Sequence, residues 1–308
     1  MNVSSLSRRE LLKSVAAGLA AAPLLNVSTL LGADTSSSTA PSPASATSLA
    51  AHDTPLTRSP LKLGIASISL KNLSLDAVIA TLHRLGLEYV SLYRTHAPWG
   101  GDVDACRVAG EKLRAARIHL MATGVVNLPN DEAVVRKAFE TAKAAQLPVM
   151  TCRPNRDAFP LIERFVKEYN IRLAIHNHGP EDKLYPTPKE AWDAAEKYDE
   201  RIGLCIDVGH TSRTAMDPVE AIEKYTSRLY DLHIKDTVAP IGAEDIPVEL
   251  GRGRMKVAAI LQALIKVKYA GQVGVEYEVE GPGKEDPVPG VAESIGFLRG
   301  VLSTLKSA

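Results

Sequence analysis

The stretch Arg172–Val208 contains two apolar runs, RLAIHNH at Arg172–His178 and IGLCIDV at Ile202–Val208. In the segment between them, Pro188–Tyr198, apolar residues recur at three- and four-residue steps, which predicts a helix. Apolar runs that are each followed by a helix are typical of strands buried on both faces of a parallel sheet. The stretch therefore predicts one strand–helix–strand unit.

The same alternation extends in both directions, from Leu61 to Leu305. Six further runs resemble the first two: LKLGIASI, YVSLY, IHLMATGVV, VMTCR, LYDLHIKD and QVGVEYE. Seven further helical patterns follow the runs, at Leu75–Leu85, Asp104–Ala116, Glu132–Ala145, Ala158–Tyr169, Pro218–Tyr225, Val257–Val267 and Val291–Leu305. Eight such units in about 245 residues predict a (β/α)8 TIM barrel. A doubly wound open sheet is the alternative, but no glycine-rich dinucleotide fingerprint follows the first run.

The first 60 residues have a different composition. A pair of arginines precedes a moderately apolar run, Val15–Leu31, and the string SRRELLK is similar to a twin-arginine export signal. Residues 34–60 are rich in Ser, Thr, Ala and Pro, which predicts a linker. We expect an export signal at 1–33, a linker at 34–60, a barrel domain at 61–308 and a periplasmic protein without a stable membrane span after processing. An uncleaved anchor or a basic amphipathic helix is the alternative for the first segment.

Charge and cysteine content narrow the classes of partner. Lys+Arg and Asp+Glu number 36 each, so no net field attracts nucleic acid or an anionic membrane. Three cysteines do not make a disulfide framework, and Cys152 and Cys205 lie inside apolar runs. We therefore expect a small, neutral or weakly charged molecule as the partner.

Polar side chains follow the last four predicted strands, where each strand ends. They are His176 and His178, Asp207 and His210, His233 and Lys235, and Glu276 and Glu278. Active sites of TIM barrels lie at this end of the strands. One such histidine alone would more often be structural, but burial of all these groups without partners would be costly. A divalent cation that binds imidazoles and carboxylates together removes that cost.

The motifs CIDVGH, DLHIKD and VGVEYE resemble the xylose isomerase-like TIM-barrel superfamily, in its sugar phosphate isomerase/epimerase branch. The resemblance extends over about Leu61–Leu305. It implies one divalent metal ion, with Mn²⁺ expected first and Co²⁺, Zn²⁺ or Mg²⁺ as alternatives. The implied ligands are His176, Asp207, His233 and Glu276.

The sequence departs from this family at His176, where the epimerase members carry a glutamate. An imidazole can replace the carboxylate as a ligand, but it differs as a base in reach and pKa. We expect His176 to bind the metal. His178, on the same strand face, is expected in the substrate pocket or behind the ligands, and the reverse assignment of the two histidines stays open.

The resemblance also suggests catalytic roles. Glu276 is the first choice of base and Glu278 the second, and His210 is expected to meet the substrate. Lys235 is expected to hold a substrate oxygen, to stabilise an enolate or to form a salt bridge with Asp236 or another carboxylate. The glycine-rich turn Gly251–Arg254 precedes a predicted helix and is a weak candidate for an anion site. The expected substrate-binding residues are His178, His210, Arg153, His96, Trp99 and Glu278.

The implied activity is a metal-dependent sugar isomerisation or epimerisation by proton abstraction. A lyase or hydratase acting on 3-keto-glycosides is the alternative, and a non-catalytic sugar-binding barrel is a further one. Apurinic endonucleases of the same superfamily use more histidine and acidic ligands than a chain with eight histidines supplies. We expect a sugar or keto-glycoside as partner and no nucleic acid, and a homo-oligomer is left open.

Overall fold

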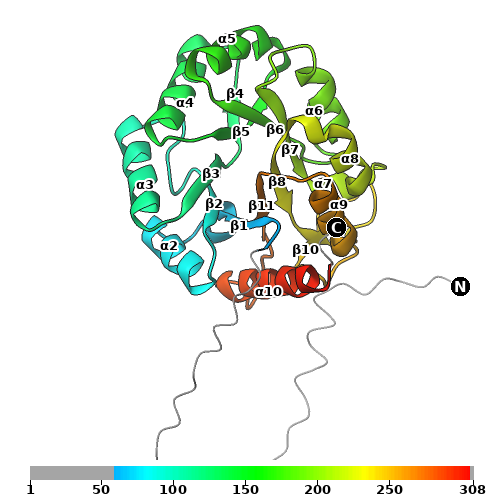
Figure 1. Ribbon diagram of the computed structural model, residues 1–308. Helices are drawn as coiled ribbons and strands as arrows, with labels where there is room; N and C mark the ends of the chain where they lie inside the picture. Colours follow the sequence, from blue (N-terminus) through cyan, green and yellow to red (C-terminus); the bar gives the residue numbers. More distant parts are fainter. Residues whose placement is uncertain (1–58, 306–308) are drawn as a thin grey trace, which may run out of the picture. The chain divides into compact units, whose positions relative to one another are not determined.

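The computed structural model describes residues 59–305 (Figure 1). The predicted export signal at 1–33 and the predicted linker up to residue 58 lie outside these residues. The described part is a closed barrel of parallel strands surrounded by helices, which confirms the predicted fold class. None of the described helices is long and apolar enough to cross a membrane.

Nine strands of the described chain form the barrel sheet, in the order β3-β2-β1-β11-β8-β7-β6-β5-β4, and a β3–β5 pairing closes it. The strands are β1 (Lys62–Ala66), β2 (Tyr89–Leu92), β3 (His119–Thr123), β4 (Val126–Leu128), β5 (Val149–Pro154), β6 (Arg172–His176), β7 (Ile202–Asp207), β8 (Leu229–Ile234) and β11 (Gln272–Val275). The third predicted run is divided into β3 and β4, which together fill one of eight barrel positions.

Eight helices match the predicted helical patterns and surround the barrel in Figure 1. They are α2 (Leu75–Arg84), α3 (Val103–Ala115), α4 (Glu132–Ala144), α5 (Phe159–Tyr169), α6 (Pro188–Ala195), α8 (Pro218–Tyr225), α9 (Val257–Lys266) and α10 (Val288–Thr304). Several begin where side chains cap them: Ser74 accepts from the backbone N–H of Ala77, and Asp217 accepts from that of Val219.

Several short elements are absent from the prediction. They are α7 (Val208–Ser212), the hairpin of β9 (Asp236–Thr237) and β10 (Pro247–Val248), and the 3-10 turns Ser67–Leu70, Arg156–Ala158 and Thr226–Arg228. The α7 turn follows β7 directly because Asp207 Oδ1 accepts from the backbone N–H of His210 at 2.8 Å. This cap puts His210 beside the end of β7.

Small side chains fill the barrel interior below the strand ends. Ala122, Val149, Ala174 and Cys205 form a buried cluster separate from the larger core between strands and helices. Ala174 and Cys205 are each two residues before a predicted metal ligand, so they share the inward face of their strands. Because this layer is small, the strand ends above it enclose open space.

The glycine-rich turn Gly251–Arg254 binds an anion of the chain itself. The Asp236 carboxylate accepts from the backbone N–H groups of Gly251, Gly253 and Met255, each at 3.0 Å. A Cβ at Gly253 would lie 2.0 Å from Asp236 Oδ1, so only glycine fits there. The turn is therefore not an anion site for a substrate phosphate.

Asp236→Asn is expected to lower the free energy of unfolding by about 1–3 kcal/mol, because an amide cannot accept from all these N–H groups. Urea unfolding of the full chain measures the change. Asp104→Asn is the matched control, because Asp104 is exposed and pairs with Arg107 at 3.3 Å on the surface of α3. Equal stability of the two variants would contradict this role of Asp236.

Candidate active site

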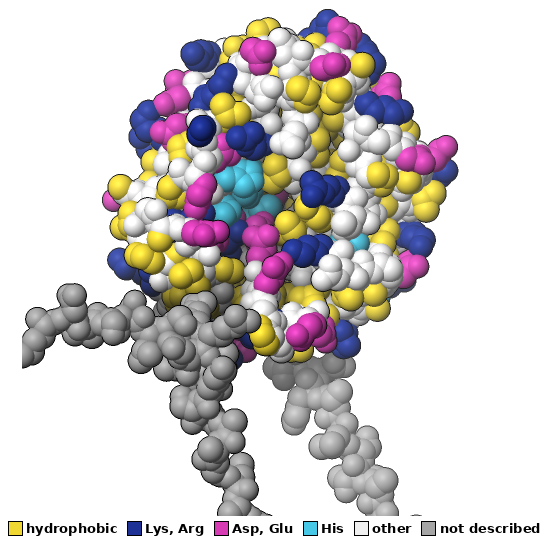
Figure 2. All heavy atoms as spheres, turned by 180° about the vertical axis from the view of Figure 1, so that it is seen from behind, with side chains coloured by type: hydrophobic (Ala, Val, Ile, Leu, Met, Phe, Trp, Pro, Cys, Tyr) yellow, Lys and Arg dark blue, Asp and Glu magenta, His cyan; other side chains and the backbone are white. Residues whose placement is uncertain are grey.

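A cavity of about 370 Å³ opens at the carboxyl ends of the barrel strands. Histidine and glutamate side chains line one side, from the ends of β6, β8 and β11 and from α7: His176, His178, His210, His233, Glu276 and Glu278. The rest of the lining includes Ser67, Ser91, Tyr93, Arg94, Asn127 and Arg153. Figure 2 shows histidines gathered in a hollow of this face, with acidic side chains beside them.

The four predicted metal ligands meet at the base of this cavity. His176 ends β6, Asp207 ends β7, His233 lies in β8, and Glu276 follows β11 directly. His176 Nε2 is 3.0 Å from His233 Nδ1 and 3.6 Å from Asp207 Oδ2, and Glu276 Oε2 contacts His233 Nδ1. One ligand atom from each of the four lies within 4.8 Å of the others.

This arrangement fits a divalent cation. Asp207 Oδ2 is buried without a hydrogen bond, and two imidazole nitrogens that face each other need a shared proton or cation between them. Two imidazoles and two carboxylates are a donor set suited to Zn²⁺, Co²⁺ or Mn²⁺.

Lys235 balances the negative charge of the site. Its Nζ is 2.7 Å from Glu276 Oε1 and 3.2 Å from both Asp207 Oδ2 and Glu278 Oε2. Burial lowers the pKa of Lys235, but the three carboxylates raise it by more than burial lowers it. The pKa of Lys235 therefore stands well above its usual range. Lys235 is buried and does not line the cavity, which favours the salt-bridge alternative over contact with a substrate oxygen.

The two glutamates after β11 differ in their surroundings. Burial raises the pKa of Glu276, but Lys235 and His233 lower it more, and it stands well below its usual range. The negative charge of Glu276, together with burial, raises the pKa of Glu278 to about 7. Two carboxylates with such different proton affinities are typical of acid–base sites.

A sequence model of the xylose isomerase-like TIM-barrel family matches residues 79–301. The chain belongs to this family. A curated relative of this xylose isomerase-like barrel, the rhizopine catabolism protein MocC of Rhizobium meliloti, is 28% identical over 142 residues. That match covers 42% of this chain and 42% of MocC, so it spans less than half of either protein.

Two solved structures share the fold of this xylose isomerase-like barrel. An IolI protein with a bound zinc atom is 16% identical with a TM-score of 0.67, over 80% of this chain and 100% of IolI. An L-ribulose 3-epimerase is also 16% identical, with a TM-score of 0.65, over 79% of this chain and 95% of the epimerase.

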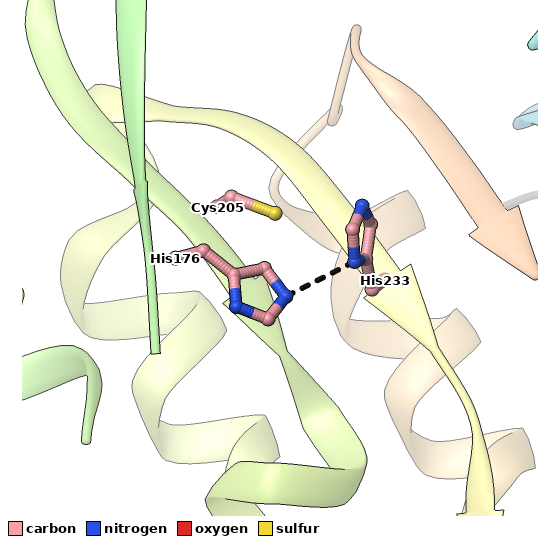
Figure 3. A group of neighbouring side chains, drawn as sticks. All are labelled: His176, Cys205 and His233. Carbon is pink, nitrogen blue, oxygen red and sulfur yellow. Dashed lines mark hydrogen bonds between the residues drawn. The ribbon is translucent and has the colours of Figure 1, made fainter. Parts of the chain in front are cut away.

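Cys205 and Asp231 lie behind His176 and His233, the two predicted histidine ligands of the xylose isomerase-like barrel. Figure 3 shows Cys205 with its sulfur turned toward His176 and His233, and burial raises the pKa of this thiol to about 12. Asp231 Oδ2 is 3.6 Å from His233 Nε2 and accepts from Thr151 Oγ1 at 2.9 Å. The Asp231 carboxylate therefore lies near His233 Nε2 but beyond hydrogen-bond distance, and this nitrogen is buried without a hydrogen bond. The position of Asp231 two residues before His233 was the available signal in the sequence.

His178 and Arg153 line the cavity, and Asp182 contacts both of them. Arg153 donates to the two oxygens of Asp182, each at 2.7 Å, and His178 Nδ1 lies 3.3 Å from Asp182 Oδ2. His178 Nδ1 is also 3.4 Å from His176 Nδ1, so His178 stands behind this ligand as well as beside the substrate space. Asp182 follows a Gly-Pro turn, and sequence reasoning missed it.

His96 and Trp99, which the sequence predicts in the substrate pocket, are not among the residues that line this cavity. His96 Nε2 donates to the carbonyl of Leu73 at 3.0 Å, and its Nδ1 lies 2.8 Å from Ser67 Oγ. Trp99 Nε1 donates to the carbonyl of Leu92 at 2.7 Å. His96 thus supports Ser67, which does line the cavity.

Asp182→Asn is expected to lower the stability at neutral pH by about 1–2 kcal/mol. Burial raises the pKa of Asp182. The Arg153 guanidinium and the N–H groups of Leu184 and Tyr185 lower it by more than burial raises it, so the pKa is about 2. Because this pKa is lower in the folded state than in the unfolded state, the ionised carboxylate stabilises the fold fully at any pH above its ordinary pKa of about 4. The stabilisation is lost as the pH falls from about 4 to about 2.

Urea unfolding of parent and variant over this pH range measures the effect, and the two curves are expected to converge toward acid. Asp193→Asn is the matched control, because Asp193 is exposed and pairs with Lys189 at the surface. A stability difference that does not change with pH would contradict the role assigned to the Asp182 charge.

Proposed function

We propose that the chain is a divalent-metal-dependent enzyme that moves a proton at a carbon of a small sugar, as an isomerase or epimerase. The observation that carries the proposal is the meeting of His176, Asp207, His233 and Glu276 at the base of one cavity, with Glu278 beside them. A cation bound to these residues would polarise a carbonyl or hydroxyl oxygen of the sugar and make the adjacent C–H more acidic. The zinc atom of IolI and the activity named for L-ribulose 3-epimerase support this reading within the shared fold.

The cavity has the size and the polar groups to hold a sugar. Its volume of about 370 Å³ is that of a small-molecule site. His210, Arg153 and Asn127 present ring, guanidinium and amide groups that bind hydroxyl oxygens. These groups orient the sugar so that one C–H faces the glutamates.

Glu278 is the proposed proton carrier. Both oxygens of Glu276 are engaged, Oε1 by Lys235 and Oε2 by His233, so Glu276 is better suited to be a ligand. Glu278 lines the cavity, its side chain is 34% exposed, and its Oε2 has the longer contact of 3.2 Å with Lys235. A carboxylate so placed can take a proton from carbon and return it.

A keto-glycoside lyase or hydratase is the second candidate, because His176 stands where a two-base epimerase of this family has a second carboxylate. The described glutamates that line the cavity both come from the end of β11, so one side of the substrate faces carboxylates. Elimination of a β-leaving group needs only one such base.

Incubation of metal-loaded protein with keto-sugars and 3-keto-glycosides in D2O tests the proposal. Solvent deuterium at one carbon without loss of a group supports isomerisation or epimerisation, whereas an unsaturated product supports the lyase. Sugar binding without turnover on any of these compounds would contradict both and support a binding protein. Glu278→Gln is expected to keep the metal and lose exchange, and full exchange in this variant would assign the base to Glu276.

We further propose that the chain is exported through its twin-arginine-type signal. Replacement of Arg8 and Arg9 by lysines is expected to retain the protein in the cytoplasm, which cell fractionation measures. Export of the double variant at the parent level would contradict the assignment.

A further inference from the structure

Arg213 is a fully buried guanidinium next to the cavity that the proposed function does not use. It follows α7, and only 2% of its surface is exposed. Nη1 donates to Glu181 and, at 2.8 Å, to the carbonyl of Ala243, while Nη2 reaches the carbonyl of His178 at 3.3 Å and His210 Nδ1 at 2.8 Å. The four N–H groups of the two Nη atoms therefore each have a partner. Because burial of a charge without such partners is costly, these contacts fix the guanidinium.

Gly179 makes room for this arrangement. Its φ of 85° lies in the region that favours glycine, and a Cβ there would lie 2.6 Å from Arg213 Nη2. The backbone of the β6–α6 loop is thus shaped around the nitrogen that contacts His210.

The contact with Arg213 determines which nitrogen of His210 carries the proton. A guanidinium has donors only, so His210 Nδ1 must accept. In a neutral imidazole the proton is then on Nε2.

Lys235 is the one described cation that competes for Nε2, with its Nζ at 3.3 Å. Two carboxylate oxygens are nearer acceptors of Lys235 Nζ, Glu276 Oε1 at 2.7 Å and Glu278 Oε2 at 3.2 Å, and Asp207 Oδ2 attracts its charge from 3.2 Å without a hydrogen bond. The shorter Arg213 contact of 2.8 Å therefore decides the tautomer.

We propose that Arg213 is a positioning residue that holds His210 in the Nε2–H form, so that His210 donates a hydrogen bond to a substrate oxygen in the cavity. His210 then stabilises negative charge that develops on that oxygen, and it is not a base. The kinetic consequence rests on the proposed function, whereas the tautomer itself does not.

The tautomer can be measured without turnover. Zinc-loaded full-length protein with ¹⁵N-labelled histidine is examined by long-range ¹H–¹⁵N correlation NMR, and His210→Gln assigns the signals. The expected result is a protonated Nε2 and an unprotonated, hydrogen-bonded Nδ1 for His210. A protonated Nδ1 in the parent protein would overturn the proposal, and this measurement needs no variant of Arg213.

Arg213→Met is expected to shift His210 toward a mixture of tautomers. Arg254→Met is the matched control, because Arg254 donates to the carbonyls of Ala239 and Ser212 in the same region without contacting His210. An equal shift of the His210 signals in both variants would overturn the specific role of Arg213.

Solvent-exchange kinetics provide the second test. Arg213→Met is expected to lower kcat by about tenfold or more with little change in KM. In a His210→Gln background, the same substitution is expected to lower kcat by no more than about twofold. Equal losses in both backgrounds would make Arg213 merely structural and overturn the proposal. A parent protein without turnover would instead contradict the proposed function, and the tautomer measurement would then decide the present proposal alone.

Discussion

Replacement of His233 by alanine is expected to abolish stoichiometric metal binding and to lower turnover by about a thousandfold or more, because it removes one of four ligands from a closed set. His233 Nδ1 lies 3.0 Å from His176 Nε2, so its loss also removes the group that fixes the second imidazole. Metal content by mass spectrometry and titration calorimetry with Zn²⁺, Co²⁺ and Mn²⁺ measure the binding.

His83→Ala is the matched control for this result. His83 is exposed on α2, and its ring contacts the carbonyl of Ala116. Loss of metal in both variants would indicate a general folding defect. Retention of one metal ion per chain in His233→Ala would contradict the site.

Lys235→Met is expected to lower the free energy of unfolding of the metal-free protein by about 3–5 kcal/mol, because three buried or half-buried carboxylates lose their counter-ion. Added divalent metal is expected to restore much of this stability, since the cation compensates the same carboxylates. Urea unfolding with a chelator and with Zn²⁺ measures both effects.

Lys266→Met serves as the control here, since Lys266 pairs with Glu223 at 2.8 Å on the surface and is 68% exposed. Such a pair contributes about 0–1 kcal/mol. Two results would contradict the charge-balancing role of Lys235: a Lys235→Met protein as stable as this control, or a Lys235→Met protein that metal does not stabilise.

The barrel and its strand ends were predictable because they depend on periodic patterns. A helical period followed by a short apolar run repeats along the chain, and closure of a parallel barrel brings the ends of all its strands to one face. The sequence pattern alone therefore groups His176, Asp207 and His233. Their strands pair as neighbours, with Asp207 opposite His233.

Loop residues were predicted less well because no period determines where a loop turns. His96 and His178 are chemically the same, but one ring is bound to a backbone carbonyl and the other faces the cavity. The side chains of Lys235 and the neighbouring Asp236 also have different surroundings. Alternation along the strand directs Lys235 to the metal ligands, whereas Asp236 turns to the glycine-rich loop.

Short elements and buried charges also escaped prediction for physical reasons. The five residues of α7 are too few to show a helical period. Arg213 lies among Thr and Ser residues, and such a polar segment predicts an exposed turn. Its burial depends on acceptors from Glu181 and Ala243, which lie far away in the sequence.

The three buried cysteines allow structural opening of the barrel to be measured by thiol labelling, without any substitution. Cys106, Cys152 and Cys205 are all buried, and Cys205 lies in the small-residue layer under the histidines. A thiol reagent can reach Cys205 only when the barrel itself separates, so the labelling rate reports how often the molecule opens. Metal that tightens the strand ends should slow the labelling of Cys205 more than that of Cys106 on α3, so the same chain reports local and global opening separately.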